Sequence, residues 1–280
     1  MAHHPRFLSY AQNCEDVRLA RAFPRGHGFY IDVGAADPVE LSVTKSLSER
    51  GWHGVNIEPQ PYYFDRLVAD RPRDVNLKIC LSDKPGDVTL YESPSHRGFS
   101  TVESTIAATW DAKGVSWRRV TVPTLALAEV CERHATEPID FLKIDVEGHE
   151  RAVLLGGDFK RYRPVVLVIE ATEQNETTLN HHLWEDVVFN ADYLFAAFDG
   201  LNRYYVRAED AALVDAIALP PNVFDDYGPI DVWSRVSELE AEVYELQETV
   251  RQLNGSLKKE LSVVVKSISG RMRKLFRRAA

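Results

Sequence analysis

Residues 28–38 read GFYIDVGAADP, a short apolar run that ends in an acid and a glycine. Such a run is typical of a buried parallel strand that leads into a tight turn, where glycine lets the backbone bend close to a ligand. The turn lacks the several glycines with which a pyrophosphate loop presents its N–H groups to an anion. One carboxylate, Asp32, and one glycine, Gly34, instead suit a ligand that carries an ammonium group.

Similar apolar runs follow along the chain, and helix-length segments separate the early ones. They span residues 54–57, 75–81, 139–144, 165–169, 193–198 and 203–207. This alternation predicts an α/β fold with a doubly wound, mostly parallel, seven-stranded sheet. Between Val88 and Val122 short alternating pieces and polar loops replace a clean helix, so we expect a β-rich excursion or lid there.

The pattern changes after the Pro, Gly and Asp residues at 220–229, which predict a domain boundary near residue 230. Beyond it, apolar residues fill heptad positions a (Val236, Val243, Val250, Leu257, Val264) and d (Leu239, Leu246, Leu253). β-branched a and leucine d positions favour a parallel two-stranded coiled coil. We expect a globular domain over 1–230, a coiled-coil helix over 231–257 that forms a homodimer, and a basic amphipathic tail over 258–280. A single helix folded back on its own domain is the alternative.

Charge is distributed unevenly along the chain. The net charge is −9, yet residues 258–278 hold eight Lys or Arg against one acid, Glu260. The acidic body argues against nucleic acid, whereas the basic, partly apolar end is typical of a segment attracted to anionic lipid. A solvated charged end is the alternative. Three distant cysteines indicate a reduced compartment, and we find no signal peptide or membrane-spanning run. We therefore expect a cytoplasmic protein, peripheral at the inner membrane face.

The second expected strand ends at Glu58, which lies 26 residues after Asp32. At that position an acidic side chain can accept hydrogen bonds from both hydroxyls of a ribose. Each acid taken alone is more often a turn or cap residue. Together they predict a nucleoside site without phosphates.

Six motifs in order resemble the FkbM family of methyltransferases, from about Ser9 to Arg207. They are SYAQNCED (9–16), FYIDVGAADP (29–38), NIEP (56–59), LSD (81–83), DFLKIDVEGHE (140–150) and DGLNRYYV (199–206). The resemblance implies a class I methyltransferase fold that binds S-adenosylmethionine. It also implies the contacts of that cofactor: Asp32, Gly34 and Ala35 at the methionine end, Glu58 and Pro59 at the ribose, Ser82 and Asp83 at the adenine, and Gln12 reaching over it. The turn reads GAAD where many class I enzymes have a second glycine, which leaves the loop geometry open.

Residues 145–150, DVEGHE, follow the fourth expected strand, at the edge where open α/β sheets place reacting ligands. Transfer of a methyl group to a hydroxyl requires removal of the hydroxyl proton, by a neutral histidine or with the help of a metal. We expect His149 as the base, with Asp145 and Glu147 in the site. Asp145, with Glu147 or with Glu170, could hold a divalent metal such as Mg²⁺. The alternative for these acids is that they cap the following helix.

The late motif at 199–206 is typical of a tight turn between two strands. In the family this region faces the acceptor, so the resemblance implies contacts from Asn202, Arg203 and Tyr204 to a carbohydrate. We expect an S-adenosylmethionine-dependent O-methyltransferase that acts on a sugar hydroxyl of a glycolipid or polysaccharide intermediate. The alternatives are methylation of a soluble, polyketide-type alcohol, a non-catalytic coiled-coil scaffold with a nucleoside-binding domain, and a nicotinamide-dependent oxidoreductase. The oxidoreductase would need the glycine-rich loop that is missing.

Overall fold

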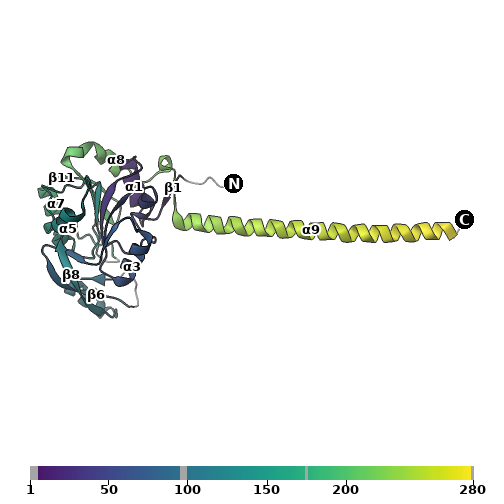
Figure 1. Cartoon of the computed structure of the whole chain (residues 1–280), viewed down its shortest axis with the longest axis horizontal. Coiled ribbons are helices and arrows are strands. Elements are labelled where there is room, and N and C mark those ends of the chain that lie inside the picture. The colour runs from purple at the N-terminus through teal and green to yellow at the C-terminus, as the bar shows by residue number, and fades with distance from the viewer. Residues whose placement is uncertain (1–5, 95–99, 174–175, 279–280) are drawn as a thin grey trace. The chain divides into compact units, whose positions relative to one another are not determined.

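The structure of the chain is a computed structural model, which describes residues 6–94, 100–173 and 176–278, with side chains of the last helix up to Gly270. Two compact units make up the chain, Met1–Pro229 and Ile230–Ala280. Figure 1 shows the strands and short helices of the first unit and the single long helix of the second. The residues that carry the sequence motifs all belong to the first unit.

Seven strands form the main sheet of the first unit. In sheet order they are β11 (Tyr193–Phe198), β12 (Asn202–Arg207), β10 (Val166–Glu170), β9 (Phe141–Ile144), β2 (Phe29–Val33), β3 (His53–Ile57) and β4 (Val75–Leu77). β12 runs antiparallel to both of its neighbours, and the other pairs are parallel. The prediction of a mostly parallel, seven-stranded sheet is therefore confirmed.

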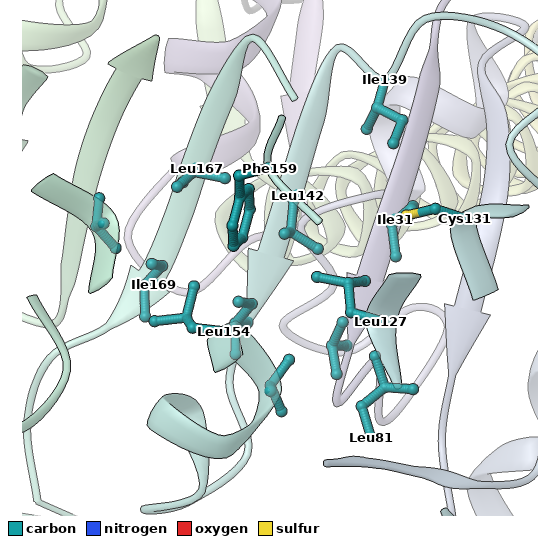
Figure 2. Close-up of a cluster of buried hydrophobic side chains, with 14 of the residues drawn as sticks. Ile31, Leu81, Leu127, Cys131, Ile139, Leu142, Leu154, Phe159, Leu167 and Ile169 are labelled. Atoms are coloured by element: carbon teal, nitrogen blue, oxygen red, sulfur yellow. The ribbon is translucent and has the colours of Figure 1, made fainter. Parts of the chain in front are cut away.

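Helices cover both faces of this sheet, because successive side chains of a buried strand point to opposite sides. Ile31 belongs to the apolar cluster of one face, part of which Figure 2 shows, and Tyr30 belongs to the cluster of the other face. The first cluster includes residues of α5 (Leu127–His134), α6 (Glu150–Leu155) and α7 (Glu185–Asn190). The second includes residues of α1 (Glu15–Ala22), α2 (Lys45–Glu49) and α8 (Val214–Ala218). This is the doubly wound arrangement that the alternation predicted.

A second sheet of four strands is inserted after β4. Its order is β5 (Cys80–Ser82), β8 (Arg118–Ala126), β6 (Gly86–Glu92) and β7 (Ser100–Thr101), and helix α4 (Ser104–Ala112) precedes β8 in the chain. The expected β-rich excursion is confirmed. The single strand expected over 75–81 is wrong, because the main-sheet strand ends at Leu77 and Cys80 starts a strand that pairs with Thr124 of β8.

The two ends of the first unit also meet. β1 (Phe7–Ser9) lies parallel to β13 (Tyr227–Pro229), with Phe7 opposite Tyr227. The remaining elements of this unit are α3 (Pro61–Asp70) and the 3-10 helices η1 (His181–Leu183), η2 (Ala208–Leu213) and η3 (Val223–Asp225).

The second unit is one helix, α9 (Ile230–Arg278), of 49 residues. It continues without a break past residue 257, where we expected the coiled-coil segment to give way to the tail. Its apolar heptad side chains from Leu239 to Leu257 are 42–59% exposed. Among the described residues, no helix combines the length and the apolar character needed to cross a bilayer.

Candidate active site

Buried acids gather where the parallel strands of the main sheet end. Asp32 lies in β2, Glu58 directly follows β3, Asp145 directly follows β9, and Glu170 ends β10. Asp32, Glu58 and Glu170 are each at most 7% exposed. Carboxyl ends of parallel strands share one edge of the sheet, which is where open α/β sheets bind their ligands.

Gly34 brings the loops after β2 and β9 into contact. Its φ is +79°, and a Cβ at this position would overlap the carbonyl oxygen of Asp145. The Asp145 N–H donates to the Val33 carbonyl at 3.0 Å, which fixes the two loops against each other. Glycine is therefore required here both for its backbone conformation and for the close approach of another main chain.

Glu58 is held by the backbone of its own loop and of the Gly34 turn. Its two carboxylate oxygens accept from the N–H groups of Ala36, at 2.9 Å, and Gln60, at 2.8 Å. Burial raises the pKa of Glu58 to about 7, although these hydrogen bonds oppose the shift. Because each carboxylate oxygen can accept more than one hydrogen bond, both retain capacity for the hydroxyls of a ligand.

Two pockets adjoin along this edge and share Gly34, Ala36 and Asp145. The Glu58 pocket, of about 140 Å³, is also lined by Glu58, Pro59, Leu81, Val146, Glu147 and His149. The Gln12 pocket, of about 420 Å³, is also lined by Gln12, Asp32, Ala35, Tyr63, Arg66 and Lys143. Six of the eight residues predicted to contact the cofactor line these two pockets together with the site acid Asp145. They are Gln12, Asp32, Gly34, Ala35, Glu58 and Pro59. The other two, Ser82 and Asp83, line a separate, more open pocket of about 300 Å³, which shares His149 with the Glu58 pocket.

Lys143 lies between two of the acids. It pairs with Asp32 in strand register, and its Nζ lies 3.6 Å from Asp32 Oδ1 and 3.1 Å from Asp145 Oδ2. Burial works against the ammonium form, but the charges of Asp145 and Asp32 outweigh it and raise the pKa of Lys143. The geometry favours a structural role for Lys143 over a catalytic one, since an ammonium whose pKa is raised is a poor proton acceptor.

Three carboxylates form a cluster at the ends of β9 and β10. One oxygen from each of Asp145, Glu147 and Glu170 lies within 4.8 Å of the others. Burial, followed by the charges of Asp145 and Glu147, raises the pKa of Glu170 well above its usual value. Glu170 Oε2 is buried and has no hydrogen-bond partner among the described residues. The predicted grouping of these acids is present, and oxygen ligands of this kind suit a hard divalent cation.

His149 precedes α6 and has contacts at both ring nitrogens. Nδ1 lies 2.6 Å from Glu103 Oε1, and Nε2 lies 3.2 Å from Ser82 Oγ. The ring is therefore held beside Ser82, at the end of the cleft predicted to hold adenine. Its role as the base stays a prediction, and it would require Nε2 to exchange Ser82 for the acceptor hydroxyl.

The first and the last motif contact each other through side chains. Asn202 Nδ2 donates to Glu15 Oε1 at 2.8 Å, and Asn13 Nδ2 donates to Asp199 Oδ1 at 3.3 Å. Burial raises the pKa of Glu15 to about 7. These contacts anchor the segment that carries Gln12 against the β11–β12 hairpin.

The three residues predicted to contact the acceptor have protein partners. Tyr204 is fully buried and donates to Asp199 Oδ2 at 2.6 Å, and Arg203 Nη2 lies 2.8 Å from Glu185 Oε1. With Asn202, they are absent from the lining of the Glu58 pocket, of the Gln12 pocket and of the pocket at Ser82 and Asp83. The predicted turn between two strands is confirmed as the β11–β12 hairpin, whereas the acceptor contacts stay a prediction.

Several residues at this edge were not identified from the sequence. They are Glu103 at the start of α4, Trp110 within it, and Asn180 after β10. They lie far along the chain from the motifs, and the strand-and-turn pattern gives no signal for them. Glu15 belongs to the motif at residues 9–16, and its acidic side chain was the feature from which a role at the site could have been predicted.

The chain is similar in sequence to known methyltransferases. Residues 32–195 match the model of the Methyltransferase FkbM domain. A 103-residue stretch is 32% identical to the hexuronic acid methyltransferase AglP of Haloferax volcanii, and it covers 35% of this chain and 38% of that relative. The match therefore spans well under half of the relative's length.

Two solved structures to which the chain is similar are each 12% identical to it. A TehB-like SAM-dependent methyltransferase from Corynebacterium glutamicum gives a TM-score of 0.37, over 69% of this chain and 87% of its own. A fibrillarin/Nop5p complex gives 0.34, over 65% and 74%.

Proposed function

This chain belongs to the FkbM methyltransferase family, and from that premise we propose that it transfers a methyl group from S-adenosylmethionine to a sugar hydroxyl of a glycolipid or polysaccharide intermediate. The observation that carries the proposal is the buried Glu58 beside the Gly34 turn, in a cleft without a glycine-rich phosphate loop. The relative from Haloferax volcanii is named for a sugar acid, which supports a sugar as the acceptor class.

The chain's own residues fit the two ends of this cofactor. Glu58 offers acceptors for the ribose hydroxyls, and Asp32 with Gln12 offers oxygens for the ammonium of the methionine end. S-adenosylmethionine supplies an electrophilic methyl group that leaves a sulfonium sulfur for the acceptor oxygen, while the hydroxyl proton must go to a base. We assign that end of the reaction to the carboxylate cluster, which includes the shared residue Asp145, and to His149, which lines the Glu58 pocket together with Asp145 and Glu147.

Glu58→Gln is expected to weaken S-adenosylmethionine binding by roughly tenfold to a hundredfold, because charge-assisted hydrogen bonds contribute about 1.5–3 kcal/mol. Since burial raises the pKa of Glu58 to about 7, the carboxylate is lost as the pH falls below that value. Wild-type affinity should therefore fall from pH 8 to pH 6, and the variant should show little of this dependence. Calorimetric titration across pH measures both effects.

The half-exposed Glu137, which faces His53, supplies the control Glu137→Gln, expected to leave binding unchanged. Unaltered affinity in folded Glu58→Gln would refute the nucleoside site. The same preparations are then assayed with labelled cofactor. Methylation of polyketide-type alcohols but of no glycan would favour the soluble-acceptor alternative, and tight binding without any turnover would favour a scaffold.

We further propose that Asp145, Glu147 and Glu170 hold a divalent cation such as Mg²⁺. The fit rests on three carboxylate oxygens within 4.8 Å of one another and on the buried Glu170 Oε2, which lacks a partner among the described residues. A cation there would make a nearby hydroxyl more acidic.

We also propose that α9 forms a parallel two-stranded coiled coil that makes the protein a homodimer. Its apolar heptad side chains are half-exposed on an isolated helix, and pairing would remove them from water. The dimer would carry two basic segments after residue 257, which together would bind an anionic membrane surface more tightly than one alone.

Exchanging the d-position residues Leu246 and Leu253 for glutamate in the full chain should convert a dimer into a monomer. Charges at a buried seam cannot be accommodated, whereas the matched control, glutamate at the b positions Tyr244 and Arg251, faces away from it. Sedimentation equilibrium measures the mass. A wild-type monomer at micromolar concentration, or a dimer that survives the d-position changes, would contradict the proposal.

A further inference from the structure

A third pocket lies next to the proposed cofactor cleft. It has a volume of about 400 Å³ and lies between α4, the loop after β9 and the segment after β10. Trp110 lines it from α4 and Lys113 from the position directly after this helix. Glu147 lines it from the β9 loop, and Thr172 and Asn180 from beyond β10. We call it the Trp110 pocket. Because Glu147 also lines the Glu58 pocket, the two meet at the carboxylate cluster.

A buried acceptor group marks this pocket as a place for a hydrogen-bond donor. Asn180 is 6% exposed, and its Nδ2 donates to the Thr172 carbonyl at 2.8 Å, which fixes the orientation of the amide. Its Oδ1 has no partner among the described residues. Leaving a buried acceptor unsatisfied is costly, so a ligand that donates hydrogen bonds would stabilise this arrangement.

The charges that line the pocket are mostly negative. Four carboxylates line it, those of Glu103, Glu147, Glu173 and Glu176. Lys113 is the cation among the lining residues, and its Nζ already lies 3.0 Å from Glu176 Oε1 and over the Trp110 ring, 4.1 Å from its centroid. Even with Glu147 on the proposed cation, three carboxylates remain against one lysine. Such a pocket repels an anion and favours an uncharged ligand rich in hydroxyl donors, for which the partly buried Trp110 offers an apolar ring.

We infer that the Trp110 pocket binds the acceptor, and that the acceptor unit is an uncharged sugar rather than a uronic acid. The inference rests on the proposed function and refines it. Asn180 Oδ1 and the surrounding carboxylates accept hydrogen bonds from the sugar hydroxyls, and the hydroxyl to be methylated points past Glu147 towards the cofactor cleft. A uronate would bring a carboxylate, which cannot donate a hydrogen bond, into an acidic pocket.

The test uses the full chain, labelled S-adenosylmethionine and two matched glycans, one ending in a hexose and the other in the same hexose oxidised to a carboxylate at C6. The wild type should use the neutral glycan with a kcat/KM at least roughly tenfold higher, an advantage that shrinks as salt screens the repulsion. Glu173→Lys should shift this ratio towards the oxidised glycan. The control Glu132→Lys, at an exposed residue of α5, should not.

Trp110→Ala should raise KM for the neutral glycan roughly tenfold with cofactor affinity unchanged, and Trp110→Phe should restore most of it, since a ring face returns. Equal or better use of the oxidised glycan, or an unchanged KM in folded Trp110→Ala, would overturn the inference.

If no glycan is methylated, the proposed function is wrong, but the inference about the Trp110 pocket can still be tested. The pocket is then judged by calorimetric titration of the neutral glycan onto the chain saturated with S-adenosylhomocysteine. Binding that is lost in Trp110→Ala would support the pocket as a sugar site, and no binding to the wild type would refute it.

Discussion

Gly34→Ala is expected to abolish measurable cofactor binding and to destabilise the first unit by about 3 kcal/mol or more. Two costs add at this position. A side chain at φ +79° is strained, and the added Cβ would overlap the Asp145 carbonyl oxygen, which the main chain of β9 holds in place. The loop after β9 must move, and it carries Asp145 and Glu147, so the cleft and the carboxylate cluster are both distorted.

Gly114→Ala separates these two costs. Gly114 has a φ of +89°, but a Cβ there meets nothing within 4 Å, so the variant should carry the backbone strain alone, about 1–2 kcal/mol. Urea unfolding gives the stability of both variants, and calorimetry gives their affinity for S-adenosylmethionine. Equal stability losses, with cofactor binding retained in Gly34→Ala, would show that the contact between the two loops is dispensable.

Removal of divalent cations should lower turnover at least a hundredfold while cofactor binding persists, and Mg²⁺ should restore turnover. Lewis-acid assistance at a reacting hydroxyl contributes several kcal/mol, and each 1.4 kcal/mol changes the rate tenfold. Glu170→Gln should have the same consequence, because it removes one carboxylate of the cluster and leaves the side-chain volume nearly unchanged.

Thermal unfolding provides a measurement that does not depend on activity. Mg²⁺ should raise the Tm of the wild type, because an ion that binds only the folded state stabilises it. It should not raise the Tm of Glu170→Gln, whereas Glu132→Gln at an exposed position should respond as the wild type does. Full turnover in excess chelator, with no metal bound, would refute the cation and leave His149 as the base to test.

The main sheet could be predicted because the residues that specify each of its strands lie next to one another in the sequence. Each buried strand is a short apolar run, and the glycine and acid that follow Val33 mark the turn without any knowledge of distant residues. The acids at strand ends could likewise be placed together, since parallel strands share one carboxyl edge. The boundary at residue 77 was missed because Val75–Leu77 and Cys80–Ser82 differ in their strand partners and not in their composition.

The side of the site that we propose for the acceptor depends on contacts between distant residues, which no local pattern encodes. Glu103 meets His149 across 46 positions of the chain, and Glu15 meets Asn202 across 187. The prediction of His149 as the base could not take account of what surrounds its ring, because composition does not reveal the contacts of Nδ1 with Glu103 and of Nε2 with Ser82. The Trp110 pocket is formed by α4, which lies within the insertion after β4, and by a segment that follows β10. Neither segment by itself predicts the pocket.

The pairing of β1 with β13, and of Glu15 with Asn202, has a consequence for how the protein is made on the ribosome. The segment that carries Gln12 is synthesised before its partners, which are translated about 190–220 residues later. At roughly 5–20 residues per second, that segment waits on the order of 10–40 s before it can dock. The wall of the Gln12 pocket that this segment forms therefore cannot close on the nascent domain before these partners are translated.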